Sequence, residues 1–131
     1  MFTKLLDKLY LGDEEDAKRL RPAMTHNDKP YIFVDARPFF NLLSGDADAG
    51  ELMICPLRAL SASLAMLIAN GVAVYLYCQA GVERSPFTAA LTLHQLGGEP
   101  RMTLMECYRE VAEKHPQTLV YPQWVEAMEG T

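Results

Sequence analysis

The sequence predicts a single α/β domain with a central, mostly parallel sheet flanked by helices. The chain has 131 residues, a length that suits one domain. Half of these residues are hydrophobic and 22% are charged, so the chain can bury a core. Short apolar runs alternate with stretches of helical pattern, which is the order expected when helices connect parallel strands. We therefore expect residues 1–131 to form one domain.

Four short apolar runs predict the strands, at residues 9–11, 31–34, 52–55 and 72–77. The last three are continuously apolar, as in strands that are buried on both faces. A proline at position 56 is expected to end the third strand. The fourth strand leads directly into Cys78.

Helices are predicted between and after these strands. The first begins in the acidic stretch from Asp13 to Asp16, because carboxylates suit the positive end of a helix dipole, and it reaches Leu20 or Met24. Residues 25–30 are predicted as a loop and residues 39–43 as a short helix. Further helices are predicted at residues 60–69, 85–96, 103–115 and 122–128, the third of these with a capping box.

Composition excludes several classes of protein. The net charge of −5 argues against a surface for nucleic acid or for an anionic membrane. Three cysteines are too few for a disulfide scaffold, so we expect reduced thiols and a cytoplasmic protein. The three histidines show no ligand-like spacing, so neither a metal site nor a cofactor is predicted.

The most informative stretch is YLYCQAGVERSP, from Tyr75 to Pro86. Cys78 stands at the carboxyl end of a buried strand, where sites of α/β sheets lie. A helix is predicted to begin near Arg84 and Ser85, so the intervening N–H groups can curl around an anion. Gly81 permits the tight bend, and Arg84 offers a planar fork to two phosphate oxygens. These positive features also favour a thiolate at Cys78.

The pattern Cys-x5-Arg-Ser resembles the signature of cysteine-dependent protein phosphatases, and CQAGVERSP is similar to their small dual-specificity branch. The stretches KLYLGDEEDAK, YIFVDAR and residues 102–128 resemble its flanking strands and closing helices. The resemblance implies a phosphatase-like fold and hydrolysis of phosphotyrosine or phosphoserine/threonine through a phosphocysteine. It implies Cys78 as nucleophile, Arg84 as phosphate clamp and Ser85 as the group that helps the sulfur leave.

The residues expected to line the phosphate site are Gln79, Ala80, Gly81, Val82, Glu83 and Arg84. The expected partners are a phosphoprotein or a small phosphomonoester, with phosphate or sulfate in the loop, and neither nucleic acid nor membrane.

The sequence departs from the family pattern at two places. Tyr77 stands where the family has a histidine that organises the loop. The loop in which the family has an aspartate general acid contains no carboxylate here. Asp35 is the preferred substitute, because it ends a strand expected to be parallel to the cysteine strand, and its alternative role is that of a strand-end cap or a partner for Arg37. Asp46 and Asp48 lie at a suitable sequence distance, but the predicted strand at 52–55 would put them at the opposite edge of the sheet.

Two further interpretations of function stay open. The missing acid would suit a non-catalytic phosphate-binding module. VDARP followed by an acidic glycine loop partly matches a rhodanese-like sulfurtransferase, although five residues between cysteine and arginine fit phosphate better than sulfur. Cys55 is considered as a disulfide partner for an oxidised Cys78, with a packed cysteine as the alternative.

Overall fold

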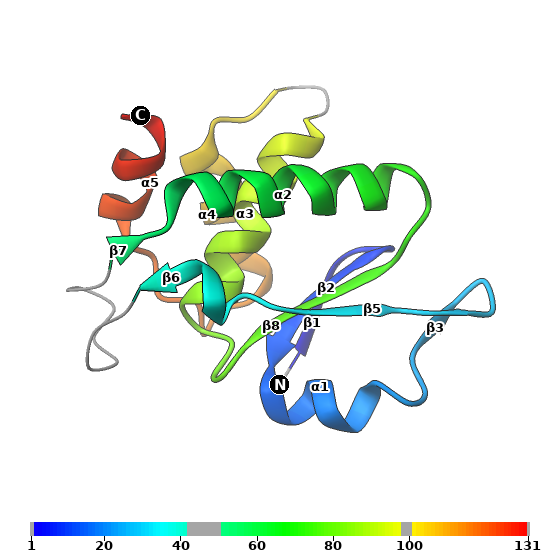
Figure 1. Cartoon of the computed structure of the whole chain (residues 1–131). Helices are drawn as coiled ribbons and strands as arrows, with labels where there is room; N and C mark the ends of the chain where they lie inside the picture. Colours follow the sequence, from blue (N-terminus) through cyan, green and yellow to red (C-terminus); the bar gives the residue numbers. More distant parts are fainter. Residues whose placement is uncertain (1, 42–50, 98–100, 131) are drawn as a thin grey trace.

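The computed structural model describes residues 2–41, 51–97 and 101–130, and its main sheet has the strand order β1-β2-β8-β5 (Figure 1). The four strands are β1 (Phe2–Leu6), β2 (Leu9–Asp13), β5 (Ile32–Asp35) and β8 (Val74–Cys78). Strand β8 is central and runs parallel to β2 and β5, whereas β1 is antiparallel to β2. The predicted α/β fold with a mostly parallel sheet is therefore confirmed.

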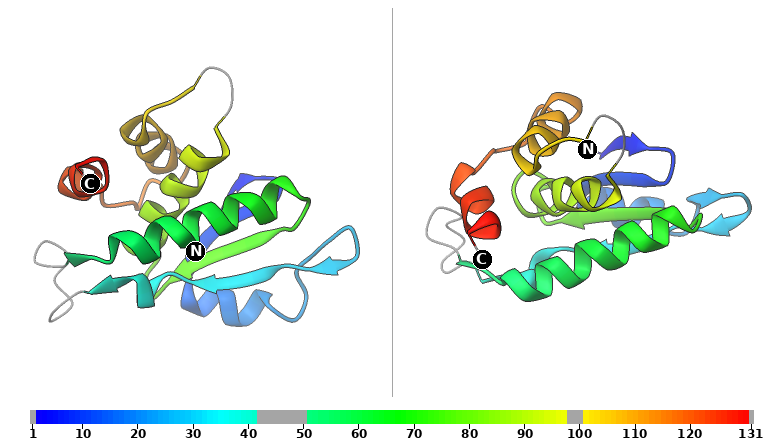
Figure 2. Two further views of the ribbon diagram at one scale, coloured as in Figure 1. Left: turned by 45° about the horizontal axis from the view of Figure 1, so that its top comes forward. Right: turned by 90° about the horizontal axis from the view of Figure 1, so that it is seen from above.

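Helices cover both faces of this sheet (Figure 2). Among the helices of the described residues, the short α1 (Glu14–Leu20) lies by itself on one face. The other face carries α2 (Ile54–Ala69), α3 (Arg84–Leu96), α4 (Leu104–Lys114) and α5 (Pro122–Glu129). Helix α3 packs between α2 and α4, and α4 also contacts α5 and β1.

Strand β8 is buried on both faces because it is apolar along its length. Val74, Tyr75 and Leu76 have no exposed surface. Side chains alternate along a strand, so Val74 and Leu76 enter the larger core while Tyr75 enters a smaller aromatic cluster under α1. In that cluster Tyr75 stacks on Phe33 with ring centroids 4.9 Å apart.

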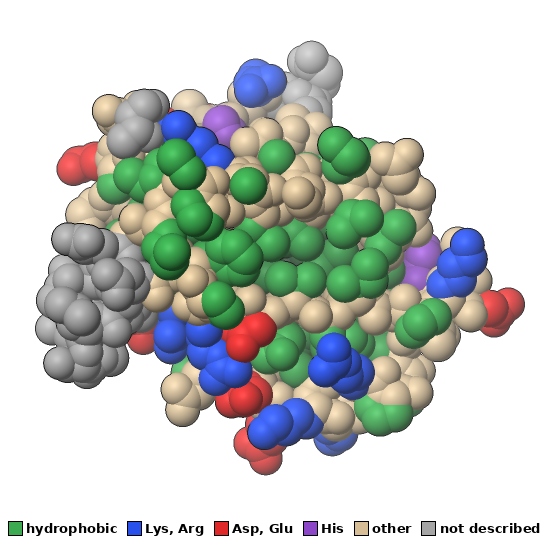
Figure 3. Space-filling view, in the orientation of Figure 1, with side chains coloured by type: hydrophobic (Ala, Val, Ile, Leu, Met, Phe, Trp, Pro, Cys, Tyr) green, Lys and Arg blue, Asp and Glu red, His purple; other side chains and the backbone are tan. Residues whose placement is uncertain are grey.

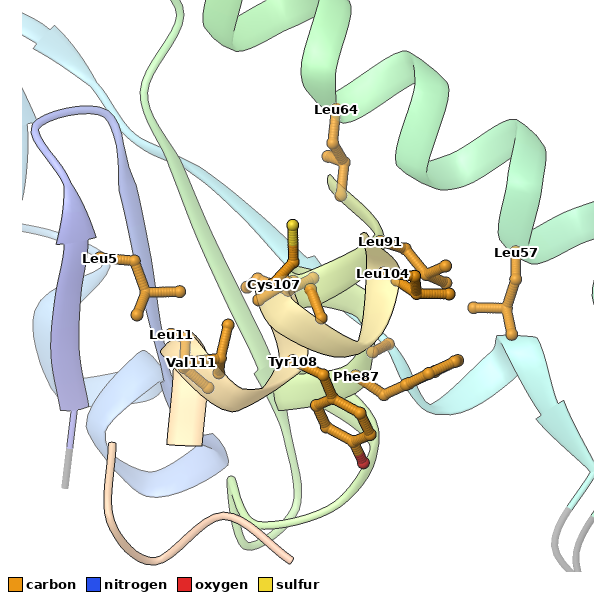
Figure 4. Packing of buried hydrophobic residues seen from close by; sticks show 14 of the residues in the cluster. Leu5, Leu11, Leu57, Leu64, Phe87, Leu91, Leu104, Cys107, Tyr108 and Val111 are labelled. Carbon is orange, nitrogen blue, oxygen red and sulfur yellow. The ribbon is translucent and has the colours of Figure 1, made fainter. Parts of the chain in front are cut away.

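The larger core fixes α4 and α5 against α3, and Figure 4 shows the part of this core in which Phe87 of α3 lies beside Tyr108 of α4. The ring of Phe87, on α3, lies 5.1 Å from the ring of Tyr108 on α4 and 5.4 Å from that of Trp124 on α5. Such tilted aromatic pairs contribute roughly 0.5–1.5 kcal/mol beyond their buried area. The connection between α4 and α5 is thereby held next to the loop that follows β8.

One predicted strand is wrong. Residues 52–55 do not form a buried strand: β7 (Glu51–Leu52) is a two-residue strand, and α2 begins at Ile54. Pro56 lies in the first turn of α2, where its missing N–H costs no helical hydrogen bond. The proline therefore marks the start of a helix. This helix begins at Ile54, six residues before the predicted start at residue 60.

Three smaller elements also differ from the prediction. Residues 25–30 form a hairpin, β3 (Thr25–His26) with β4 (Lys29–Pro30), turned by Asn27 and Asp28 at positive φ. In place of a helix from residue 39, a 3-10 helix (Arg37–Phe39) leads into β6 (Phe40–Asn41), which pairs with β7; residues 42 and 43 lie outside the described part. The half-exposed strand β1 was not predicted, because its pattern lacks a continuous apolar run.

Strand β5 is an edge of the main sheet, and the surface beside it is apolar. Figure 3 shows hydrophobic side chains in a band between α2 and β5. Ile32, Met53 and Met66 are exposed hydrophobic residues of these elements and their ends. The catalytic candidates lie beyond one end of this band, at the carboxyl edge of the sheet.

Candidate active site

The loop from Cys78 to Arg84 joins the carboxyl end of β8 to the amino end of α3, as the sequence predicts. Cys78 is 1% exposed and lies opposite Asp13 in the register of β8 with β2. The helix begins at Arg84, with Pro86 in its first turn. The thiol, the loop and a helix amino end thus meet at one place, where a helix dipole favours negative charge.

Ser85 is the direct polar neighbour of the Cys78 sulfur. Its backbone N–H donates to Cys78 Sγ at 3.3 Å, and its hydroxyl Oγ lies 3.2 Å from the same sulfur. Ser85 has no exposed surface, and its hydroxyl is also 3.4 Å from the Gly12 carbonyl oxygen. The backbone N–H is therefore a fixed donor to the sulfur, and the hydroxyl has one proton that it can direct to the sulfur or to the Gly12 carbonyl.

Gly81 is where the loop needs glycine. Its φ is +72°, and a Cβ at this position would lie 2.9 Å from both the carbonyl carbon and the carbonyl oxygen of Gly12. The loop therefore packs directly on the backbone of β2, leaving no room for a side chain. This contact fixes how closely the cysteine loop packs against the end of β2.

The loop's carbonyl groups are tied to atoms outside the loop. The Glu14 N–H donates to the Gln79 oxygen at 3.2 Å, His115 Nε2 to the Gly81 oxygen at 2.8 Å, and the Leu119 N–H to the Val82 oxygen at 2.8 Å. Residues 79–83 form bends without hydrogen-bonded turns, and their N–H groups donate to no acceptor among the residues the structure describes. Carbonyls fixed outward and N–H groups left unpaired are what an anion-binding loop requires.

Arg84 contributes a further unpaired donor, in addition to the backbone N–H groups of the loop. Its Nε is buried and has no hydrogen-bond partner in the described part of the chain. Leaving a buried guanidinium N–H without an acceptor costs free energy, so such a group favours a ligand that supplies one. Arg84 also lies near enough to Asp35 to help lower the pKa of that carboxyl group.

Asp35 lies at the predicted edge of the sheet, opposite Tyr77 in the register of β5 with β8. Both of its carboxylate oxygens accept hydrogen bonds from Arg37, the shortest at 2.7 Å from Nη2. The same guanidinium donates to Glu14 at 3.2 Å. Arg37 therefore bridges two carboxylates beside the cysteine loop.

This pairing sets the charge of Asp35. Partial burial raises its pKa, but the hydrogen bonds and positive charge of Arg37, with the charge of Arg84, outweigh burial and lower the pKa overall. Asp35 is consequently a carboxylate at neutral pH in this arrangement. Its assignment as general acid stays a prediction, and it requires that Asp35 be released from Arg37 and protonated.

The alternative acids Asp46 and Asp48 lie outside the described residues. The topological reason for setting them aside is wrong, because residues 52–55 are not a strand of the main sheet. Strand β7 instead pairs with β6, which follows Asp35 at the carboxyl edge. Both residues therefore remain candidates.

The predicted neighbour of Cys78 at position 55 is also absent. Cys55 is exposed in the first turn of α2, and β8 has β2 and β5 as its neighbours. Both thiols are free in the structure. The geometry gives no support to a disulfide between Cys55 and Cys78.

Two features of the site could not be predicted from sequence. Tyr77 packs with Tyr75 in the aromatic cluster under α1, their ring centroids 6.3 Å apart. His115, at the end of α4, is fully buried and contacts the loop, with its other ring nitrogen, Nδ1, 2.6 Å from Thr3 Oγ1. The only sequence signal for His115 is its place at the predicted helix end, where Pro116 follows.

Other kinds of site are not seen in the described residues. They contain no group of three or more histidine, cysteine, aspartate or glutamate side chains that could hold a metal ion. None of their helices has both the length and the apolar character needed to cross a membrane.

Substituting alanine at Gly81 should disrupt the loop. The new Cβ would overlap the Gly12 backbone at a φ that alanine disfavours, so we expect a loss of stability of about 2 kcal/mol or more and loss of anion binding. Urea denaturation and tungstate binding measure the two effects. Gly71→Ala is the matched control, because Gly71 also has positive φ but a Cβ there would have no atom within 4 Å. Equal behaviour of the two variants would contradict the packing argument.

Folding should keep His115 neutral. Burial lowers the pKa of His115 and outweighs the opposing hydrogen bond to the Gly81 carbonyl and the charge of Asp13. An unfolded histidine has a pKa of about 6.5 and takes up a proton that the folded state excludes. The free energy of unfolding should therefore fall as pH drops below about 6.5, by at most about 1.4 kcal/mol per pH unit. Urea denaturation of the wild type and His115→Gln between pH 5 and 8 checks this, and parallel curves would contradict it.

Neither a family model nor a curated protein matches the sequence. Solved structures do match over most of the chain. A mouse putative dual specificity phosphatase, in complex with zinc tungstate, has a TM-score of 0.70 and 15% identity, covering 98% of this chain and 86% of its own. Human DUSP28 has a TM-score of 0.66 and 15% identity, covering 98% and 90%.

A viral structure extends the likeness. OH1 from the Orf virus, a tyrosine phosphatase with triple substrate specificity, has a TM-score of 0.64 and 22% identity, covering 95% of this chain and 80% of its own. The TM-scores establish similarity of fold, in agreement with the resemblance of the cysteine loop. The chain has the fold of the dual-specificity phosphatases.

Proposed function

We propose that this protein is a cysteine-dependent phosphatase that hydrolyses phosphotyrosine, phosphoserine or phosphothreonine monoesters. The observation that carries the proposal is the unpaired state of the loop. The loop combines a buried thiol beside the Ser85 N–H and hydroxyl, unpaired backbone N–H groups and a buried, unpartnered Arg84 Nε, and these are the donors that bind a tetrahedral oxyanion. The fold of the dual-specificity phosphatases supports the same function.

The chemistry proposed has two displacements at phosphorus. The N–H groups of residues 79–83 and the Arg84 guanidinium bind the phosphoryl oxygens. The Cys78 thiolate attacks phosphorus, an S–P bond forms, the ester O–P bond breaks, and the leaving oxygen takes a proton. Water then attacks the phosphocysteine, the S–P bond breaks, and phosphate leaves. Ser85 stabilises the sulfur as it regains negative charge.

The leaving oxygen needs a proton, and we propose Asp35 as its source. In the structure Arg37 holds Asp35 as a carboxylate, so its protonated form is scarce at neutral pH. Protonation of the leaving group contributes roughly 10²–10⁴ to rate. The enzyme should accordingly work best at acidic pH and on aryl phosphates, whose oxygen leaves readily without a proton.

The proposal also concerns the class of the physiological substrate. Among structures of similar fold, that of PTPMT1 is in complex with PI(5)P, and OH1 has triple substrate specificity. The loop recognises the phosphoryl group itself, so phosphoprotein and small phosphomonoester substrates fit it equally. A reduced cytoplasmic setting would suit the three free cysteines.

A non-catalytic phosphate-binding module is the second candidate. The observation that favours it is the engagement of Asp35 by Arg37. A human tyrosine phosphatase-like serine/threonine/tyrosine-interacting protein has a similar fold, with a TM-score of 0.63 and 12% identity. Fold alone therefore does not distinguish a phosphatase from a non-catalytic phosphate-binding module, whereas a measurement of turnover does.

Turnover of p-nitrophenyl phosphate tests the enzyme. We expect phosphate release that Cys78→Ser abolishes. Arg84→Lys should reduce kcat by about 10²-fold or more, because lysine cannot replace the planar fork. Cys55→Ser is the matched control and should retain activity, since Cys55 is exposed on α2. Tungstate binding without any phosphate release would favour the non-catalytic module.

Leaving-group dependence tests Asp35. If Asp35 donates the proton, Asp35→Asn should lower kcat for phenyl phosphate by about 10²–10⁴ and for p-nitrophenyl phosphate far less. Arg37→Gln should raise the rate on phenyl phosphate at pH 7, because it removes the partner that lowers the pKa of Asp35. Equal losses on both substrates would contradict the assignment. Asp46→Asn and Asp48→Asn, measured alongside, would then identify the donor.

A further inference from the structure

We propose that His115 is the positioning residue of the cysteine loop, acting from α4 through the Gly81 carbonyl and fixed from behind by Thr3. The inference rests on the proposed function, because it assigns the support of the same phosphate site. The histidine that supports this loop is thus not at position 77, where the sequence has tyrosine. It comes from a different part of the chain.

The direction of the hydrogen bonds follows from chemistry. A carbonyl oxygen only accepts, so the contact of 2.8 Å with Gly81 requires a proton on His115 Nε2. In a neutral imidazole the other nitrogen then accepts, so the Thr3 hydroxyl donates to Nδ1 across 2.6 Å. The hydrogen bonds thus run in one direction: Thr3 donates to His115, and His115 donates to the Gly81 carbonyl.

The place of His115 makes this support rigid. The ring has no exposed surface, so water does not compete for its hydrogen bonds. Its backbone caps α4 through Val111, and its own carbonyl accepts from Thr118 at 3.0 Å from N–H and 2.7 Å from Oγ1. The residue is therefore held on both sides, by a helix end before it and a turn after it.

The held carbonyl belongs to Gly81, the residue of the loop with positive φ. Glycine has more backbone freedom than other residues, so rotation of the peptide plane after Gly81 is the motion that would turn a carbonyl toward the anion. A carbonyl facing the site would repel both a phosphate and the thiolate. The bond from His115 keeps that oxygen outward, and the Leu119 N–H does the same for the Val82 oxygen.

Tyr77 does not provide this support. It stands one residue before Cys78, and its side chain points to the opposite face of the sheet, where it packs with Tyr75. The histidine that contacts the loop instead comes 37 residues after Cys78 in the chain, at the end of α4. The tertiary fold brings these two segments together.

The test compares His115→Asn with His115→Gln. Glutamine can place an amide N–H where His115 Nε2 stands, whereas the shorter asparagine reaches only the Nδ1 position. Tungstate affinity of the folded proteins is measured by calorimetry. We expect His115→Asn to bind about tenfold more weakly than wild type, the loss of one good hydrogen bond, with most of that affinity recovered in His115→Gln. Thr3→Val should give a smaller loss.

A second readout follows the thiol itself. Alkylation of Cys78 by iodoacetamide is measured by peptide mass spectrometry as a function of pH. His115→Asn should shift the pH profile upward, because a carbonyl free to turn inward disfavours the thiolate. Val111→Ala is the control for general destabilisation: it removes core volume one turn earlier on α4, so it should lower stability but leave anion affinity and the alkylation profile unchanged.

The outcomes separate this inference from the proposed function. Wild type that binds tungstate but releases no phosphate, with weaker binding in His115→Asn, would overturn the enzyme and support the positioning role. Active wild type with unchanged affinity and alkylation profile in His115→Asn would overturn the positioning role alone. Equal losses in His115→Asn and Val111→Ala would also overturn it. Absence of tungstate binding by wild type would overturn both.

Discussion

The whole site depends on a contact between two stretches of backbone, the cysteine loop at Gly81 and the end of β2 at Gly12. The two are so close that no side chain fits between them. This contact fixes the depth of the loop under α3 and brings Ser85 within reach of both Cys78 and Gly12. The groups around the sulfur are consequently held in place by the fold itself, which is the preorganisation that electrostatic catalysis requires.

The rest of the fold serves to hold that loop from outside. Its carbonyls are bonded to α1, to the end of α4 and to the connection before α5, at Gln79, Gly81 and Val82 respectively. The aromatic contacts of Phe87 with Tyr108 and Trp124 place those helices. Burial raises the pKa of Tyr108, whose hydroxyl stays protonated and donates to the Leu119 carbonyl in that connection. Packing in the core is thus transmitted to the geometry of the proposed phosphate site.

Local chemistry explains which parts of the fold could be predicted from sequence. The strand before Cys78 and the helix from Arg84 are specified by an apolar run, a glycine and a proline within a few residues of each other. The prediction of a strand at residues 52–55 was wrong because an apolar run before a proline suits either a strand end or a helix start. In the folded chain this run begins helix α2. The pairing of Asp35 with Arg37 was an alternative from the sequence, whereas the contact of His115 with the loop and that of Arg37 with Glu14 depend on segments that only the folded chain brings together.

The central claim is that Cys78 forms a covalent bond to phosphorus, and its most direct test is to trap that intermediate. The protein is mixed with p-nitrophenyl phosphate, quenched in acid within milliseconds and digested, and the Cys78 peptide is analysed by mass spectrometry. The account predicts one added phosphoryl group on Cys78, present at early times and absent in Cys78→Ser. Phosphate release without any such adduct, or an adduct on another residue, would contradict it.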